Sequence, residues 1–177
     1  MDFALHTPSA PLDQFVECLW FHKIPVYKAR ELILPSQYME LIVNFGAPHR
    51  VLDPEYPARF EVHSQAWLAG MQSRYITIES DTSHMIGARF KPGGAAAFLP
   101  QPISDLSDKV TPLDSLFGPA AARLRRELLS AEDRGKCFTI LERFLLERFD
   151  PQRPGLDTVM GRSDRSRRAA AGWACVS

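Results

Sequence analysis

The sequence predicts an α+β fold, in which a β-barrel or sandwich of short antiparallel strands is followed by an α-helical C-terminal segment. Short apolar or alternating runs, broken by Pro, Gly, Asn and His, recur at near-regular spacing over residues 15–90, a pattern typical of a barrel or sandwich. After residue 93 the apolar residues recur at helical spacing instead. The 177 residues, 45% hydrophobic and 24% charged, can form one globular core without a disulfide or a metal.

The strands are predicted from aromatic and β-branched residues bounded by turn residues. The clearest covers residues 39–45, where apolar residues at odd positions alternate with Glu40, Ile42 and Asn44 at even positions. The aromatic-rich run 15–22 is another. The remaining predicted strands are 31–34, 59–63, 66–70, 74–79 and 84–90.

The helices are predicted from caps and apolar stripes. Pro92 and two glycines lead into a short helix over 95–99, which Pro100 closes. A capped turn is expected near Asp114, and a longer helix opens at Pro119. The last helix is expected from about residue 136 to 149.

These patterns divide the chain into three regions. Residues 1–92 form the predicted barrel-like sensing region, and residues 93–150 a helical dimerisation or linker region. Residues 151–177 are predicted to be a poorly ordered tail, since from residue 154 on the apolar residues follow neither a strand nor a helix period. The abrupt loss of periodicity also fits a truncated or frameshifted reading frame.

Charge and cysteine content exclude several classes of protein. Twenty-one basic residues balance twenty-one acidic ones, which argues against a dedicated nucleic-acid-binding domain. Cys18, Cys137 and Cys175 form no CxxC pair, so neither a disulfide framework nor a zinc ribbon is expected. The sequence shows neither a signal-peptide pattern nor an apolar run of membrane-spanning length, so we expect a cytoplasmic protein without membrane contact.

Motifs for catalysis and cofactors are not found. The sequence has no nucleophile elbow, P-loop or dinucleotide fingerprint, so we expect no catalytic residue, no cofactor and no enzymatic activity. A cupin-like metal site needs two histidines one residue apart, and no His-x-His occurs. The scattered histidines are therefore interpreted as surface or loop residues: His6, His22, His49, His63 and His84.

Five residues of the strand region are candidates for effector binding. A barrel that encloses a ligand is lined by inward aromatic residues and a few polar groups. Trp20 and Trp67 are the large aromatic residues, and Glu40, Asn44 and Arg89 are the polar residues within strand-like runs. If the face that carries these polar residues points outward, they are only solvated.

An apolar stripe on the last predicted helix is the candidate dimer interface. It consists of Ile140, Leu141, Phe144, Leu145 and Phe149. The alternative is that this stripe packs on the barrel of its own chain.

Several runs together resemble the N-terminal domain of AraC/XylS-type bacterial transcriptional regulators. Their order and spacing match over roughly residues 8–150. The runs are 15–20, Leu34-Pro35, 39–46, 67–70, 87–95 and 110–118.

The resemblance implies a cupin-like β-barrel that senses a small molecule, followed by helices that mediate dimerisation. An effector in the barrel would favour one arrangement of the helices, and the helices would set the dimer geometry presented to DNA. The resemblance implies a small-molecule effector and a second copy of the chain as partners. It places DNA recognition in a helix-turn-helix half that residues 154–177 do not resemble.

Two other functions stay open on the sequence alone. One is a free-standing small-molecule-binding barrel with no transcriptional role. The other is a cupin-like enzyme, such as an isomerase, which needs an acid–base pair inside the barrel. Glu40 with His84 is the best pair available for that chemistry.

Overall fold

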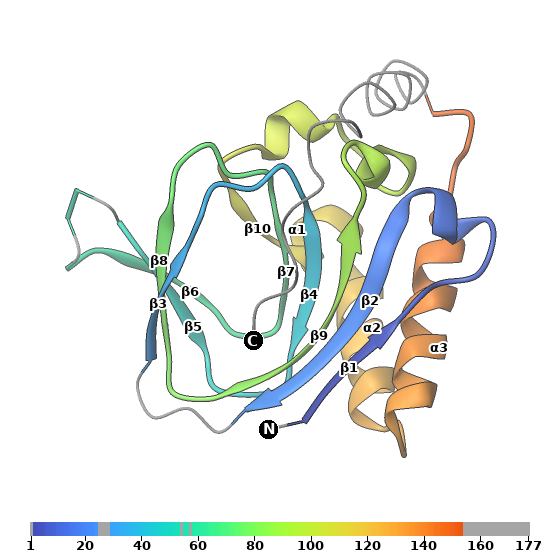
Figure 1. The fold of residues 1–177 in the computed structure, drawn as a ribbon, viewed down its shortest axis with the longest axis horizontal. Coiled ribbons are helices and arrows are strands. Elements are labelled where there is room, and N and C mark those ends of the chain that lie inside the picture. The colour runs from blue at the N-terminus through green and yellow to red at the C-terminus, as the bar shows by residue number, and fades with distance from the viewer. Residues whose placement is uncertain (1, 25–28, 54, 57, 154–177) are drawn as a thin grey trace.

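Two antiparallel sheets face one another in the computed structural model, which describes residues 2–24, 29–53, 55–56 and 58–153 (Figure 1). The six-stranded sheet has the order β1 (Asp2–His6), β2 (Val16–Ile24), β9 (Ser83–Phe90), β4 (Glu40–Asn44), β7 (Ala66–Ala69) and β10 (Val110–Pro112). The four-stranded sheet has the order β3 (Ala29–Ile33), β8 (Ile76–Ser80), β5 (His49–Leu52) and β6 (Phe60–His63). No strand of one sheet pairs with a strand of the other in this part of the chain, so the sheets are not closed into one barrel.

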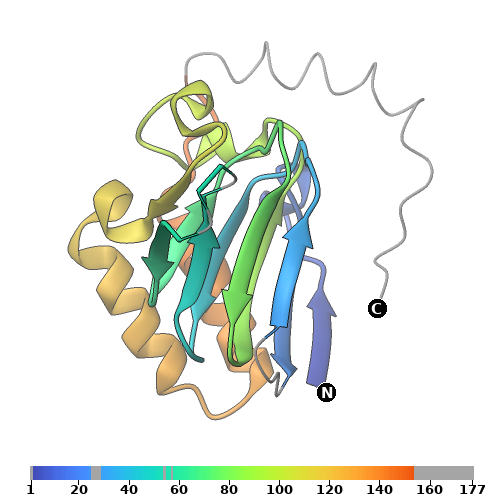
Figure 2. The same ribbon diagram turned by 90° about the vertical axis from the view of Figure 1, so that its left-hand side faces the viewer.

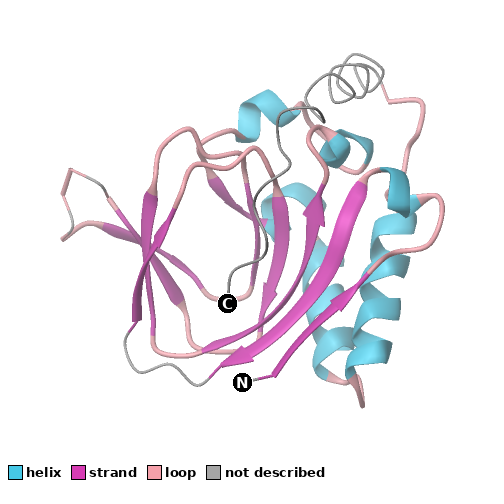
Figure 3. Ribbon diagram, in the orientation of Figure 1, coloured by secondary structure: helices cyan, strands magenta, loops and turns pink. Residues whose placement is uncertain are grey.

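Helices cover the six-stranded sheet on the side that faces away from the four-stranded sheet (Figure 3). The α-helices are α1 (Leu113–Phe117), α2 (Pro119–Leu129) and α3 (Arg134–Leu146). Three short 3₁₀ helices are η1 (Leu12–Gln14), η2 (Gly94–Ala97) and η3 (Ile103–Leu106). Over the described ranges, no helix has the length and apolar character needed to cross a membrane.

The main hydrophobic core lies between this helix layer and the six-stranded sheet. Leu41 and Val43 of β4 point into it and are fully buried, because alternate residues of a strand point to opposite faces. Leu124 of α2 and Leu141 of α3 enter the same core from the helix side. Removing apolar side chains such as these from water stabilises the fold by about 1.5–3 kcal/mol each.

The predicted α+β class, with antiparallel strands before C-terminal helices, is confirmed. Each predicted strand overlaps an observed one, and the two longer predicted helices are α2 and α3. Three strands were missed: β1, β5 and β10. β10 has three residues and ends at Pro112, which is too short for a period to show. The part of the predicted tail from residue 154 on lies outside the described residues.

On the face of the six-stranded sheet that points away from the helices, the Trp20 ring packs closely against Gly87 of β9. Gly87 pairs with Trp20 of β2 on one side and with Ile42 of β4 on the other. A Cβ atom at Gly87 would lie 2.4 Å from the Trp20 ring and 2.7 Å from the Leu41 carbonyl oxygen. The missing side chain therefore leaves room for the Trp20 indole to lie against β9.

We expect Gly87→Ala to lower the free energy of unfolding by about 1–3 kcal/mol, because the added methyl group collides with a ring and with backbone. Denaturant unfolding followed by tryptophan fluorescence measures the change. Gly135→Ala in α3 is the matched control, since its Cβ atom meets only the Asp133 carboxylate, at 3.2 Å. Equal stability losses in the two variants would contradict this account of Gly87.

Candidate functional site

Aromatic rings and imidazoles from both sheets meet in the space between them. Trp67 of β7 lies 5.4 Å, ring centre to ring centre, from His49 of β5 and 5.8 Å from His63 of β6. Trp20 and His22 are two residues apart on β2, and their ring centres are 6.2 Å apart. These side chains fill the centre of the molecule and join the two sheets.

The interpretation of His22, His49 and His63 as surface or loop residues was wrong. His49 and His63 are paired across β5 and β6, and their exposed fractions are only 4% and 7%. His22 shares the inward face of β2 with Trp20, because strand side chains alternate. The spacing of histidines along the chain does not reveal that strands far apart in sequence face each other.

The other two histidines lie outside this cluster. The His6 ring stacks on Phe138 at 5.2 Å, and its Nε2 lies 3.2 Å from a Glu142 carboxylate oxygen. His84 packs against Phe21 and Phe45 on the helix side of the sheet.

The structure separates Glu40 from His84. Glu40 of β4 lies opposite Arg89 of β9. Arg89 and His84 are an odd number of residues apart on β9, so their side chains point to opposite faces. Glu40 and His84 therefore lie on opposite faces of the sheet and cannot act as an acid–base pair.

Four buried ring nitrogens between the sheets make no hydrogen bond to any residue that the structure describes: Trp20 Nε1, His22 Nε2, His49 Nδ1 and His63 Nε2. The nearest carboxylate to His63 Nε2 is that of Glu61, at 3.6 Å. His22 and His49 also line a cavity of about 40 Å³ together with Glu31. Because buried polar groups are nearly always hydrogen-bonded, a small polar group that entered this cavity would gain hydrogen bonds there.

Burial lowers the pKa of His22, His49 and His63 below 6.5. His49 is lowered further by its neighbours His22 and His63. The three imidazoles are therefore neutral at pH 7 and each offers one donor and one acceptor. No three His, Cys, Asp or Glu side chains of the described residues are placed to bind a metal ion together.

Glu40 and Arg89 form an ion pair on the inward face. Arg89 Nε donates to Glu40 Oε1 at 2.6 Å, and the guanidinium lies 5.5 Å from the centre of the Tyr38 ring. Of the five predicted effector residues, the structure thus joins Glu40 to Arg89. It places Trp20 and Trp67 with the histidines.

Asn44, the fifth predicted effector residue, is fully buried and holds two loops together. Its side-chain amide donates to the Ala47 carbonyl at 2.8 Å and to the Ser64 carbonyl at 3.3 Å. Its side-chain oxygen accepts a hydrogen bond from the Gly46 N–H at 3.0 Å. Both the side-chain nitrogen and the side-chain oxygen are therefore bound to backbone groups, so Asn44 has a structural role.

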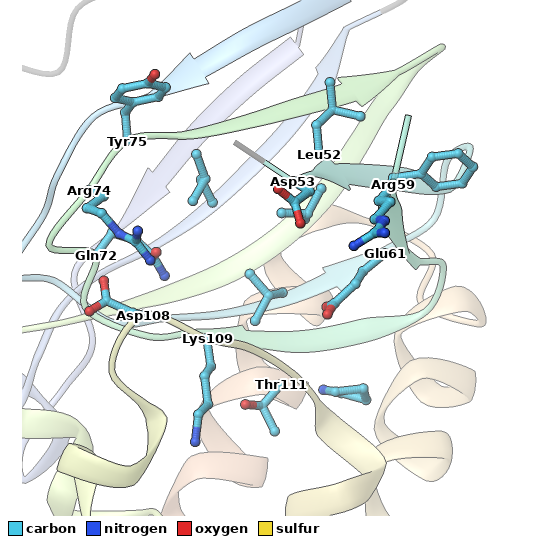
Figure 4. Close-up of a pocket in the computed structure, with 15 residues that line it drawn as sticks. Leu52, Asp53, Arg59, Glu61, Gln72, Arg74, Tyr75, Asp108, Lys109 and Thr111 are labelled. Carbon is cyan, nitrogen blue, oxygen red and sulfur yellow. The ribbon is translucent and has the colours of Figure 1, made fainter. Parts of the chain in front are cut away.

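A larger cavity of about 650 Å³ opens where β6 of one sheet lies near β10 of the other (Figure 4). Its walls come from both sheets and mix apolar and polar side chains, with the apolar Val51 and Ile76 on one side and Val110 and Pro112 on the other. None of the five predicted effector residues lines it. The sequence signal that was missed is a set of charged residues within or within two residues of the strands: Asp53, Arg59, Glu61, Arg74, Asp108 and Lys109.

Two of the three acidic groups at this cavity are already bound. Asp108 accepts hydrogen bonds from the N–H and hydroxyl of Ser73, and Asp53 accepts from the N–H groups of Glu55 and Tyr56. These bonds lower the pKa of both aspartates. A lowered pKa keeps both aspartates negatively charged, so the lining carries three acidic and three basic side chains. Of the basic groups, Lys109 Nζ donates to the Asp105 carbonyl, the Arg59 guanidinium lies over the Tyr56 ring, and Arg74 lies near Asp108.

The predicted dimer stripe packs within its own chain. Leu141, Phe144 and Leu145 are buried under the six-stranded sheet, and Ile140 and Phe149 are half-buried beside the same core. The structure thus favours the alternative in which this stripe covers the sheet.

We expect Asn44→Ala to lower the free energy of unfolding by about 2–3 kcal/mol, because it leaves buried backbone groups without partners. Gln72→Ala is the control, since that buried amide donates one hydrogen bond, to the Gly70 carbonyl, and should cost about 1 kcal/mol. Denaturant unfolding measures both. A stable Asn44→Ala protein would show that the loop contacts are dispensable.

We also expect stability to fall on mild acidification. The unfolded histidines titrate near 6.5 and the native ones below it, so the unfolded state binds more protons as the pH drops. Unfolding free energies measured at about pH 7.5 and about pH 5 should differ by more than about 1 kcal/mol. His49→Phe should reduce this difference, whereas Trp67→Phe, which keeps all three imidazoles, should not. A difference unaffected by His49→Phe would contradict the assignment.

Comparison with known proteins places the strand region in a family. No curated protein matches the chain. A family model described as "Domain of unknown function (DUF6597)" matches residues 4–112. The match runs from β1 through the end of β10 and covers more than half of the chain. The chain therefore belongs to the DUF6597 family.

Proposed function

We propose that this chain is the small-molecule-sensing part of an AraC/XylS-like transcriptional regulator. The two facing sheets then form an incompletely closed, cupin-like barrel, and the effector binds between them. The observation that carries the proposal is the 650 Å³ cavity between β6 and β10, because small-molecule sites are usually concave spaces of roughly 300–1,000 Å³ with apolar walls and a few polar groups.

The lining favours an effector with an apolar body and a carboxylate. Val51, Ile76 and Val110 would contact the apolar body. Arg74 makes no hydrogen bond within the described residues, although its charge lowers the pKa of nearby Asp108, and Figure 4 shows its guanidinium over the cavity near Gln72 and Asp108. An arginine binds a carboxylate through two parallel N–H donors, so Arg74 is the proposed anchor.

The cavity wall continues directly into the helices. β10 ends at Pro112, and α1 begins at the fully buried Leu113. Phe117 of α1 packs edge-to-face on Phe144 of α3, with ring centres 5.6 Å apart. An effector seated against β10 would therefore favour one position of α1 and, through this contact, of α3. A ligand can shift such an equilibrium only through its different affinity for the two states.

The proposal includes a homodimer and DNA recognition by a helix-turn-helix half, both drawn from the resemblance of the sequence to AraC/XylS-type regulators. In that scheme the helices transmit the state of the cavity to the geometry of the dimer.

A ligand screen tests the sensing role. A panel of small organic carboxylic acids and their uncharged amides is titrated against the protein, with thermal unfolding as the first readout and calorimetry for the compounds that stabilise it. We expect carboxylates to bind better than their amides. Arg74→Gln should weaken carboxylate binding by about 10- to 100-fold, the equivalent of a charge-assisted hydrogen bond of about 1.5–3 kcal/mol.

Arg30→Gln is the matched control, because Arg30 lies outside the cavity and pairs with Glu79 on β8. It should leave carboxylate binding unchanged. Binding that survives Arg74→Gln, or that Arg30→Gln weakens equally, would refute the proposed site.

A further inference from the structure

β1 forms one edge of the six-stranded sheet in the described part of the chain. Among the described residues it pairs with β2 alone, and it is the outermost strand of its sheet in Figures 1 and 2. Phe3 and Leu5 stand on the face away from the helices, and their exposed fractions are 46% and 54%. An edge strand presents a row of unpaired N–H and C=O groups, which another strand can bind.

Of the four edges in the described sheets, β1 carries the least protection against pairing. β10 is only three residues long and ends at Pro112, and proline cannot donate to a neighbouring strand. β3 carries two adjacent charges, Arg30 and Glu31, and β6 carries Glu61. In β1 the central residues are Phe, Ala and Leu, with Asp2 and His6 only at the ends, and its pairing with β2 has no bulge.

We propose that β1 pairs antiparallel with β1 of a second copy of this chain and so joins two six-stranded sheets into one. The inference rests on this edge and on the α3 residues beside it. It supplies an interface for the homodimer that the proposed function includes, and it does not depend on effector binding or on DNA recognition. With the two-fold axis at Ala4, Phe3 of one copy lies opposite Leu5 of the other. The exposed apolar side chains then form one continuous strip, of the kind that stabilises cross-strand pairs.

Charges flanking β1 are complementary in this arrangement. Asp2 and Arg134 of α3 form an ion pair at one end of the strand. His6 and Glu142 of α3 contact each other at the other end, with 3.2 Å between Nε2 and Oε1. The two-fold axis places the first end against the second end of the other copy, so Arg134 lies near the other copy's Glu142. Opposite charges meet at both ends of the interface.

Self-pairing accounts for this edge better than an unrelated partner strand. A strand that is apolar at its centre, and that has the oppositely charged Arg134 and Glu142 of α3 beside its two ends, is complementary to itself when it runs antiparallel. A five-residue strand pair covers less than the roughly 800 Å² per partner of a standard interface. The contact must therefore extend along α3, where Arg134 and Glu142 lie.

Sedimentation velocity of the full chain over a concentration series tests the proposal. The wild-type protein should dimerise, and the double substitution Phe3→Lys with Leu5→Lys should weaken the dimer by at least about tenfold, because it sets like charges opposite one another. The control is Leu32→Lys with Leu34→Lys on and just after β3, two sites of 57% exposure. It adds the same charge to another edge and should leave the dimer intact. Thermal unfolding verifies that each variant is folded.

A charge-reversal experiment tests the register and does not depend on the lysine variants. Arg134→Glu and Glu142→Arg should each weaken the homodimer, because each sets like charges against each other across the axis. An equimolar mixture of the two variants should form a heterodimer, in which both contacts are attractive again. A monomeric wild-type chain, a dimer that survives Phe3→Lys with Leu5→Lys, or a mixture that stays monomeric would each overturn the proposal.

Discussion

The two-residue period of the six-stranded sheet is the constraint on which the rest of the structure depends. In β2, β4 and β9, one set of alternate residues is mostly apolar and packs against the helices. The other set faces the second sheet and includes Trp20, Glu40 and Arg89. Since the pleat assigns every residue to one of two faces, the same strands build a dry core on one side and a polar, aromatic interior on the other. A shift of one residue would exchange the two sets.

Periodicity predicted this arrangement well wherever strands were long enough to show it. The alternation over residues 39–45 correctly separates Leu41 and Val43 from Glu40 and Asn44. Pro119 located the start of α2, and the apolar stripe located α3. The prediction placed the start of α3 near residue 136 and missed Asp133, which accepts a hydrogen bond from the Lys136 N–H and caps the helix two residues earlier. β1, β5 and β10 were missed because three to five residues next to Pro or polar residues carry no measurable period.

Prediction of the candidate site was less complete, for a physical reason. A single strand shows which residues share its face, and Trp20 and Trp67 were proposed as the large aromatic residues of the strand region. It does not show which other strand that face meets. His49 and His63 come from a second sheet and meet Trp67 only after both sheets have formed. Asn44 matched the pattern of an inward polar residue, yet its bonds to Gly46 and Ala47 come from the loop that follows it in the chain.

The order of the strands places the two proposed binding sites, the effector cavity and the dimer edge, at opposite edges of the same sheet. β10, which borders the cavity, and β1, which forms the dimer edge, lie at opposite edges of one sheet. The helix layer spans both edges: α1 follows β10 directly, and α3 contacts β1 through Arg134, Phe138 and Glu142. Phe117 and Phe144 join α1 to α3. A ligand at one edge and a second copy of the chain at the other would therefore act on the same packed helices. A displacement of α1 would reach the dimer contact through the Phe117–Phe144 ring contact and α3, rather than through the sheet.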